Sequence, residues 1–217
     1  MGINIDNYNR IITETAGQNV TLVAVSKTKP ASDILELYNL GQRDFGENYV
    51  QELADKQIVL PADIRWHFIG HLQSNKVKYI ASFVHLIHGV DSYKLLVEIN
   101  KQALKNNRTI DCLLQVHIAR EETKFGFDAE ELDNAMESLA INPLSNIRVC
   151  GLMGMASFTD DENKVRSEFR VLKGLFNKYA TLHNWKIISM GMSGDYTLAI
   201  SEGSTMVRIG SLILNPR

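Results

Sequence analysis

Short apolar runs rich in β-branched residues alternate with amphipathic segments along the whole chain. The runs lack a strict apolar-polar alternation, which is typical of parallel strands that are covered on both faces. A strand followed by a helix, repeated eight times, predicts a (β/α)8 barrel, because an open doubly wound sheet more often has about five to seven strands. The expected strands are Thr21–Lys27, Asp44–Asn48, Arg65–Gly70, Leu86–Asp91, Cys112–Ala119, Arg148–Ala156, Lys186–Ser193 and Met206–Leu214.

The segments between these runs have a helical pattern. Asp91-Ser92 and Thr159-Asp160 are expected to cap two of them. An additional amphipathic segment, Ile3–Thr15, precedes the first strand and is expected to plug the bottom of the barrel. No linker, low-complexity tract or repeat divides the sequence, so residues 1–217 are expected to form one domain. The expected helices are Ala31–Leu40, Val50–Gln57, Leu72–Phe83, Tyr93–Asn106, Asp128–Leu139, Asp161–His183 and Tyr196–Glu202.

The composition limits the classes of partner that this chain is expected to bind. A chain of 217 residues that is 45 % hydrophobic and 22 % charged can bury a full core. Its net charge of −2 gives no electrostatic footprint for nucleic acid or for an anionic membrane, so small molecules are the favoured partners. The first ten residues have no apolar leader core, and no run approaches the length of a membrane span, so we expect a cytoplasmic protein.

Cysteines and histidines give no sign of a metal site. Cys112 and Cys150 lie in apolar runs without a Cys-x-x-Cys pair, which predicts core thiols in a reducing compartment. His85 and His88 are three residues apart in an expected strand, and such residues point to opposite faces. We therefore expect no metal ligands.

Lys27 ends the first expected strand, and turn residues follow it at once. Ligands of β/α barrels gather at the carboxyl ends of the strands, where apolar walls favour the neutral form of an amine. A neutral amine can attack an aldehyde. From this segment alone, a lysine that only extends to water remains the ordinary alternative.

Two clusters of glycine and serine follow the seventh and eighth strands, at residues 189–194 and 208–211. The corresponding loops of β/α barrels commonly bind phosphate through backbone N–H groups and hydroxyls. Arg208 shares the period-two face of Met206 and Gly210, which places a guanidinium beside this loop if that face points inward. Relief of crowding at the strand ends is the alternative explanation for the glycines.

The eighth strand of such a barrel pairs with the first, so the amine and the phosphate loops become neighbours. An aldehyde that carries a phosphate spans both, and pyridoxal 5′-phosphate (PLP) is the cofactor with these two groups. An arginine facing the pyridine nitrogen keeps that nitrogen unprotonated and weakens the ring as an electron sink.

Long blocks of the chain resemble the pyridoxal phosphate homeostasis proteins, also called the proline synthase co-transcribed family. The matches run in order from about residue 21 to about residue 213. They are Val23-Ala24-Val25-Ser26-Lys27-Thr28-Lys29-Pro30, Phe45-Gly46-Glu47-Asn48-Tyr49-Val50-Gln51-Glu52, Trp66-His67-Phe68-Ile69-Gly70-His71-Leu72-Gln73-Ser74-Asn75-Lys76, Ser189-Met190-Gly191-Met192-Ser193 and Gly203-Ser204-Thr205-Met206-Val207-Arg208-Ile209-Gly210.

This resemblance implies a fold-type III barrel like the N-terminal domain of alanine racemase, without the second domain of that enzyme. It implies that Lys27 forms a Schiff base with PLP and that Arg208 faces the pyridine nitrogen. It further implies that Asn48 lies near the ring and that His67 lines the site from the third strand. Lys124, after the fifth strand, matches a family lysine that reaches the pocket mouth, with a solvated loop lysine as the alternative. The implied phosphate ligands are Ser189, Ser193, Gly210 and Ser211.

Two functions fit these features. The first is a PLP carrier that takes part in cofactor homeostasis, with PLP-dependent apoenzymes as possible recipients. The alternative is a PLP-dependent racemase or decarboxylase of amino acids, which needs acid and base groups on both faces of the bound substrate. Since no second domain supplies the second base, the carrier is favoured, no catalytic residue is assigned, and a monomer is expected. A Schiff-base aldolase is more remote.

Overall fold

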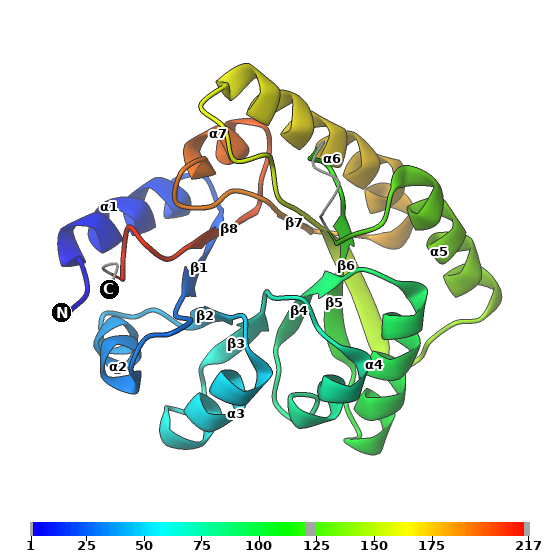
Figure 1. Ribbon diagram of the computed structural model, residues 1–217, viewed down its shortest axis with the longest axis horizontal. Coiled ribbons are helices and arrows are strands. Elements are labelled where there is room, and N and C mark those ends of the chain that lie inside the picture. The colour runs from blue at the N-terminus through cyan, green and yellow to red at the C-terminus, as the bar shows by residue number, and fades with distance from the viewer. Residues whose placement is uncertain (1, 120–124, 215–217) are drawn as a thin grey trace.

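The protein forms a closed barrel of parallel strands in chain order, surrounded by helices (Figure 1). The structure is a computed structural model that describes residues 2–119 and 125–214. The predicted (β/α)8, or TIM, barrel is confirmed. Its strands are β1 Thr21–Val25, β2 Asp44–Glu47, β3 Arg65–Phe68, β4 Leu86–Val90, β5 Ile110–Val116, β6 Ile147–Gly154, β7 Ile187–Ser189 and β8 Met206–Ile209.

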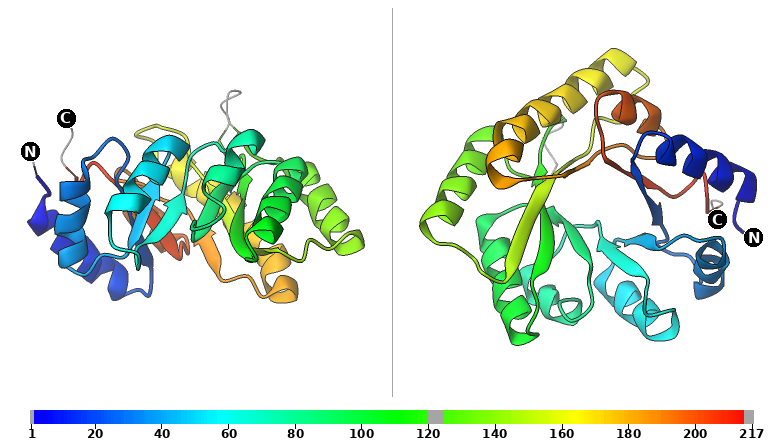
Figure 2. Two further views of the ribbon diagram at one scale, coloured as in Figure 1. Left: turned by 90° about the horizontal axis from the view of Figure 1, so that it is seen from below. Right: turned by 180° about the vertical axis from the view of Figure 1, so that it is seen from behind.

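The helices lie on the outer side of the barrel in every view (Figure 2). One predicted helix, Leu72–Phe83, is instead a short 3-10 helix. Val77 is its buried residue, and the backbone N–H of the C-cap, Ile80, donates to the Val77 carbonyl oxygen three residues back, as in a 3-10 turn. The helical elements are α1 Ile5–Ala16, α2 Ala31–Asn39, α3 Val50–Val59, η1 Ser74–Tyr79, α4 Tyr93–Lys105, α5 Ala129–Ile141, α6 Glu162–His183 and α7 Tyr196–Ser201.

Helix α1 does not plug the barrel, so that prediction was wrong. The helix packs on the outer wall beside β1 and β8 (Figure 1), and Tyr8 and Ile11 on its inner side are buried. After β8 the described chain contains only a turn and a single bridge from Leu214 to Ile3. The apolar face of α1 therefore covers the part of the barrel wall that a helix after β8 would cover.

Helix caps and strand ends agree with the sequence in part. Ser92 caps α4 as predicted, whereas α6 is capped by Asp161, one residue beyond the predicted pair. The strands β1, β7 and β8 are shorter than predicted at their carboxyl ends, because turn residues and glycines end the regular pairing. Lys27 and the residues after Ser189 consequently lie in loops at the mouth of the barrel.

Two sets of buried side chains form the core. The larger set fills the space between the strands and the helices and includes Phe45, Phe68 and Phe169, all fully buried. A smaller apolar set lies inside the barrel. Cys112 is a buried free thiol, as predicted, whereas Cys150 is only half-buried. Among the described residues, no helix has the length and apolar character that crossing a membrane requires. The inner set comprises Val23, Leu86, Leu113, Met153 and Met206.

The position of α1 predicts unequal effects of two isoleucine truncations in this helix. Ile11→Ala should lower the free energy of unfolding by about 2–5 kcal/mol, because Ile11 is fully buried against the barrel wall. Ile5→Ala should cost less than about 1 kcal/mol, because Ile5 is 43 % exposed. Urea denaturation measures both, and equal losses would contradict the packing of α1 as part of the wall.

Candidate functional site

The carboxyl-terminal mouth of the barrel brings the first and last strands together. Val23 and Arg208 are register partners in the parallel pair of β1 and β8. Val23 and Met206 belong to the apolar set inside the barrel, so Arg208, two residues after Met206 in β8, points inward as well. Lys27 and Gly210 lie in the loops that follow β1 and β8, and the side chain of Lys27 is exposed at the mouth.

A buried ion pair lies beside the turn that carries Lys27. Lys56 Nζ donates to Glu47 Oε1 at 2.7 Å and to the backbone oxygen of Ser26 at 2.8 Å. The Ser26 hydroxyl donates to the same Glu47 oxygen at 2.6 Å. Burial raises the pKa of the Glu47 carboxyl, and Lys56 opposes this rise. The pair thus fixes the residue that precedes Lys27.

The residue after Lys27 is held from the same side. Thr28 has a φ of 61°, in the left-handed region, which costs a β-branched residue about 1–2 kcal/mol. Its backbone N–H donates to Glu52 Oε1 at 2.6 Å, and this oxygen also accepts from Lys56 Nζ at 2.7 Å. Because both neighbours of Lys27 are anchored to one cluster, the lysine leaves the turn in a defined direction.

Arg208 is a fixed cation inside the barrel. Its Nη1 donates to the Ser189 hydroxyl at 2.6 Å and to the Ser189 carbonyl oxygen at 2.9 Å, and its Nη2 donates to the Gly154 carbonyl oxygen at 3.2 Å. Burial lowers the pKa of Arg208 to about 10, so the side chain remains charged at neutral pH. Three anchoring bonds leave the guanidinium little freedom to turn.

Two of the sequence-predicted phosphate residues meet across the loops that follow β7 and β8. The Gly210 N–H donates to the Ser193 hydroxyl at 3.3 Å. Gly191, at the start of the first loop, has a φ of 97°, and a Cβ there would lie 2.6 Å from the Cβ of Ala199. The loop can therefore pass close to α7 only with glycine at this position. Ser211 is exposed directly after Gly210.

Ser189 and His67 are not grouped with these loop residues. Ser189 is fully buried, and its hydroxyl lies 3.1 Å from His88 Nδ1 in addition to its bond with Arg208. Both ring nitrogens of His67 are occupied, by His88 Nε2 at 2.9 Å and by Asp44 Oδ1 at 3.0 Å. The structure therefore places both side chains inside the barrel, beneath the mouth, and separates His67 from Lys27.

Three buried polar side-chain atoms lack a hydrogen-bond partner among the described residues: Glu47 Oε2, Asn48 Oδ1 and His117 Nε2. Asn48 follows β2 on the inward face of Asp44, as the resemblance implies, and His117 follows β5 on the inward face of Gln115. Buried polar atoms are normally paired, so an unpaired one indicates a missing ligand or water.

Sequence reasoning missed His117, because the predicted strand Cys112–Ala119 includes this residue, whereas β5 ends at Val116 and leaves His117 directly after the strand end. It also missed the roles of Glu47, Glu52 and Lys56, because their function depends on contacts with the turn of Lys27. Lys124 lies outside the described residues.

The whole chain matches a known domain. The family described as alanine racemase, N-terminal domain, matches residues 4–216. The chain thus belongs to the class of β/α-barrel proteins built on this domain. Within it, a pyridoxal phosphate homeostasis protein of Aquifex aeolicus is 42 % identical over 205 residues, which cover 93 % of this chain and 89 % of that protein. That of Escherichia coli is 38 % identical over 208 residues, covering 92 % and 87 %. The chain belongs to the pyridoxal phosphate homeostasis protein family.

Solved structures agree with this assignment. PipY of Synechococcus elongatus, solved with PLP bound, is 33 % identical with a TM-score of 0.81, covering 93 % of this chain and 98 % of that chain. Alanine racemase of Bartonella henselae has a TM-score of 0.70 at 18 % identity, which shows a shared fold. The match covers 95 % of this chain but 56 % of the racemase. The barrel therefore corresponds to one part of that enzyme.

The ion pair beside Lys27 predicts a pH-dependent loss of stability. Lys56→Met leaves the Glu47 carboxylate buried without its cation. It should lower the free energy of unfolding by about 3–5 kcal/mol near neutral pH. Without Lys56, the pKa of Glu47 rises further above its value in the unfolded chain. Stability is then retained at low pH, where the carboxyl is neutral, and is lost as the pH rises through the folded-state pKa.

The decrease in the free energy of unfolding caused by Lys56→Met should accordingly become smaller as the pH is lowered from about 8 to about 5, as measured by urea denaturation at each pH. The matched control is the double variant Glu47→Leu with Lys56→Met, which removes both charges and should lose less than Lys56→Met alone. A pH-independent loss, shared by the double variant, would show that packing rather than the charge of Glu47 dominates.

Proposed function

We propose that this chain binds PLP as a Schiff base with Lys27 and takes part in intracellular PLP homeostasis. The observation that supports this proposal is the pairing of β8 with β1, because the turn of Lys27 follows β1 and the loop of Gly210, whose N–H donates to Ser193, follows β8 at the same mouth. The unpaired Oδ1 of Asn48 supports it as well. When bound, PLP supplies an aldehyde that reacts with amines and a ring that withdraws electrons.

The residues of the mouth divide the binding task. Ser193 and Gly210 offer a hydroxyl and an open backbone approach for the phosphate, with Ser211 beside them. Asn48 faces the ring. Arg208 directs its guanidinium to the pyridine nitrogen, and since it stays charged at neutral pH, it donates a hydrogen bond without giving up a proton. This arrangement keeps the ring nitrogen unprotonated.

The buried positions of Ser189 and His67 give them a different role from the one the resemblance implies. Ser189 accepts a hydrogen bond from Arg208. His88 is hydrogen-bonded to Ser189, and His67 is hydrogen-bonded to His88. We assign both residues to the support of Arg208 rather than to direct contact with PLP.

The carrier function rests on the family as well as on the mouth. The relatives between 37 and 42 % identical are named as homeostasis proteins. A PLP-dependent racemase or decarboxylase of amino acids remains the alternative, and the comparisons give it no added support. The chain matches 56 % of an alanine racemase, so the remainder of that enzyme has no counterpart in the residues compared.

We further propose that residues 1–217 act as one PLP-binding domain, as a monomer in the cytoplasm, and pass the cofactor to apoenzymes. The free, buried thiol of Cys112 fits a reducing compartment. The net charge of −2 gives no reason to add nucleic acid to the partners.

Covalent attachment at Lys27 has a direct spectroscopic test. The protein incubated with PLP should show the visible absorption of a lysine Schiff base, and borohydride should fix the cofactor mass on the peptide that contains Lys27. Lys27→Ala should abolish both signals. Lys29→Ala, two residues away in the same turn, is the matched control and should retain them. Equal trapping in Lys27→Ala and in the unchanged protein would overturn the assignment.

Carrier and enzyme differ in their effect on amino acids. The PLP-loaded protein, mixed with a panel of amino acids in deuterated water, should exchange α-protons far below the usual turnover range of about 1–1000 per second. Proton NMR measures this exchange. Exchange of any amino acid at ordinary enzymatic rates would establish the racemase alternative in place of the carrier.

A further inference from the structure

A second cavity lies at the opposite, amino-terminal mouth of the barrel. It has a volume of about 250 Å³. Most of its lining residues are the first of their strands, so it is separated from Lys27 by the length of the barrel. Polar side chains dominate it, although the purpose of this end of a β/α barrel is usually stability alone. The lining residues are Thr21, Asp44, Arg65, His67, His85, Leu86, Asp111, Ile187 and Met206.

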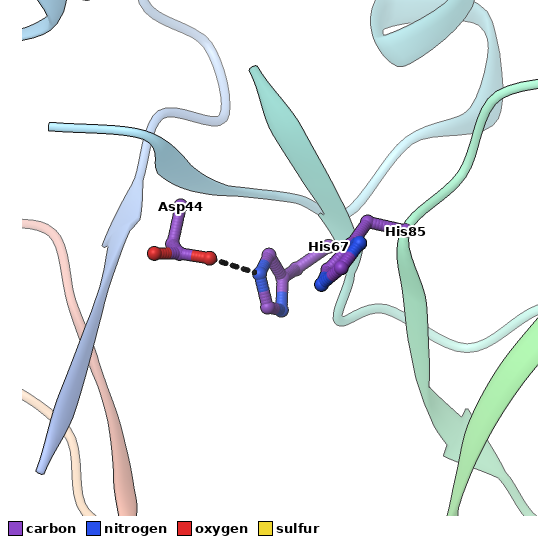
Figure 3. A group of neighbouring side chains, drawn as sticks. All are labelled: Asp44, His67 and His85. Carbon is purple, nitrogen blue, oxygen red and sulfur yellow. Dashed lines mark hydrogen bonds and ion pairs between the residues drawn. The ribbon is translucent and has the colours of Figure 1, made fainter. Parts of the chain in front are cut away.

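Three of these residues present metal-binding atoms to one point. One carboxylate oxygen of Asp44 and one ring nitrogen each of His67 and His85 all lie within 4.8 Å of one another, as Figure 3 shows for their side chains. Asp44 Oδ1 and His67 Nε2 are already 3.0 Å apart. Zinc bonds of about 2.0–2.2 Å require ligand atoms about 3.3 Å apart. The remaining adjustment falls to His85, the exposed member of the three, whose ring lies 5.4 Å from the ring of His67.

We propose that this cavity is a binding site for a divalent transition metal of the zinc class, with Asp44, His67 and His85 as its protein ligands. Two imidazoles and one carboxylate are a ligand set that zinc and its neighbours accept, with water completing the coordination. The sequence argument against a metal considered only the pair His85 and His88, and in the structure the rings of both lie near the ring of His67. The ligand partners of His85 come instead from β2 and β3.

The surroundings of His67 fit this role. A metal-binding histidine normally donates its second ring N–H to a neighbouring acceptor, which fixes the ring and its tautomer. His67 Nδ1 lies 2.9 Å from His88 Nε2, and both rings are buried. The ring of His67 is thereby held with Nε2 directed into the cavity.

The positive charge of Arg65 should weaken metal binding at this site, so two kinds of substitution should change the metal affinity in opposite directions. Arg65 Nε donates to Asp44 Oδ1 at 2.7 Å, and its Nη2 donates to Oδ2 at 2.5 Å. Because 47 % of the Arg65 side chain is exposed, the guanidinium can keep Oδ2 while Oδ1 turns to the metal. Its positive charge still repels the ion. Removal of that charge should therefore strengthen metal binding, whereas removal of a ligand should weaken it.

The metal ligand His67 belongs to a chain of hydrogen bonds that ends at Arg208. Without metal, every member is satisfied when Ser189 donates to His88, His88 donates to His67, and His67 donates to Asp44. Ser189 then accepts from Arg208. In this arrangement each of the two rings carries a single N–H, on the nitrogen that donates.

Metal binding exchanges the donor and acceptor roles along this series of hydrogen bonds. His67 Nε2 must lose its hydrogen to bind the ion, so the ring proton moves to Nδ1 and is donated to His88 Nε2. His88 then carries its proton on Nδ1 and donates it to Ser189. Each imidazole keeps one proton, so none is gained or lost overall. Ser189 keeps its hydroxyl hydrogen, which no longer bonds to His88 and can donate to another acceptor near Arg208; this consequence rests on the proposed PLP site.

Metal binding is tested on the protein without PLP. Zinc titration by calorimetry and cobalt(II) titration by visible absorption should both report one site. His85→Ala should weaken binding at least about tenfold, and its exposed position makes it safe for folding. Arg65→Gln should tighten binding. The matched control is His183→Ala, an exposed histidine on α6, which should change nothing. Failure of zinc to bind, or equal binding by His85→Ala and the unchanged protein, would overturn the site.

Coupling to the cofactor is tested separately on the PLP-loaded protein. Zinc should shift the visible absorption of the unchanged protein and leave the spectrum of His85→Ala as it was. A constant spectrum while zinc binds would refute the reversal of the hydrogen-bond chain and leave the metal site standing. Failure to bind PLP at all would overturn the proposed function, and the zinc titration without PLP would still decide the metal site.

Discussion

The pairing of β8 with β1 is the interaction on which the site depends. It closes the barrel, and its register sets Val23 opposite Arg208. Because side chains of a strand alternate between its two faces, this register directs both Val23 and Arg208 into the barrel. The turn of Lys27 follows β1 and the loop of Gly210 follows β8, so segments from opposite ends of the chain meet at the same mouth. Closure also removes the exposed strand edges that an open sheet would carry.

Inside the barrel, a continuous chain of polar side chains lies beside the apolar set that includes Val23 and Met206. Arg208, Ser189, His88, His67 and Asp44 are joined by hydrogen bonds of 2.6 to 3.1 Å. A buried polar group is costly unless it is paired, and each member of this chain is paired on both sides. The arrangement fixes the guanidinium of Arg208. It also connects Arg208 by hydrogen bonds to the cavity at the opposite end of the barrel, which Asp44 and His67 line.

The sequence predicted much of this structure. Continuous apolar runs identified the strands of the barrel, and period-two reasoning placed Arg208 with Met206 on one face. The differences between the predicted and the observed secondary structure lie mainly at the ends of strands and helices. The strand β7 ends at Ser189, because glycine and serine end the pairing, and η1 replaces a predicted helix. The position of α1 could not be read from its amphipathic pattern, since that pattern shows that one face is buried but does not say against which surface.

The sequence by itself determined the alternation of strands and helices, the reactive groups at the strand ends, and the family. These properties follow from local periodicity and from motifs that are continuous in the chain. Only the tertiary structure decided that Lys56 and Glu52 hold the turn of Lys27, that Ser189 supports Arg208, and that His67 meets Asp44 and His85. The reason is physical. A hydrogen bond or a metal site requires atoms about 3 Å apart, and for residues distant in the chain that distance is set by strand register and barrel closure, which no local pattern encodes.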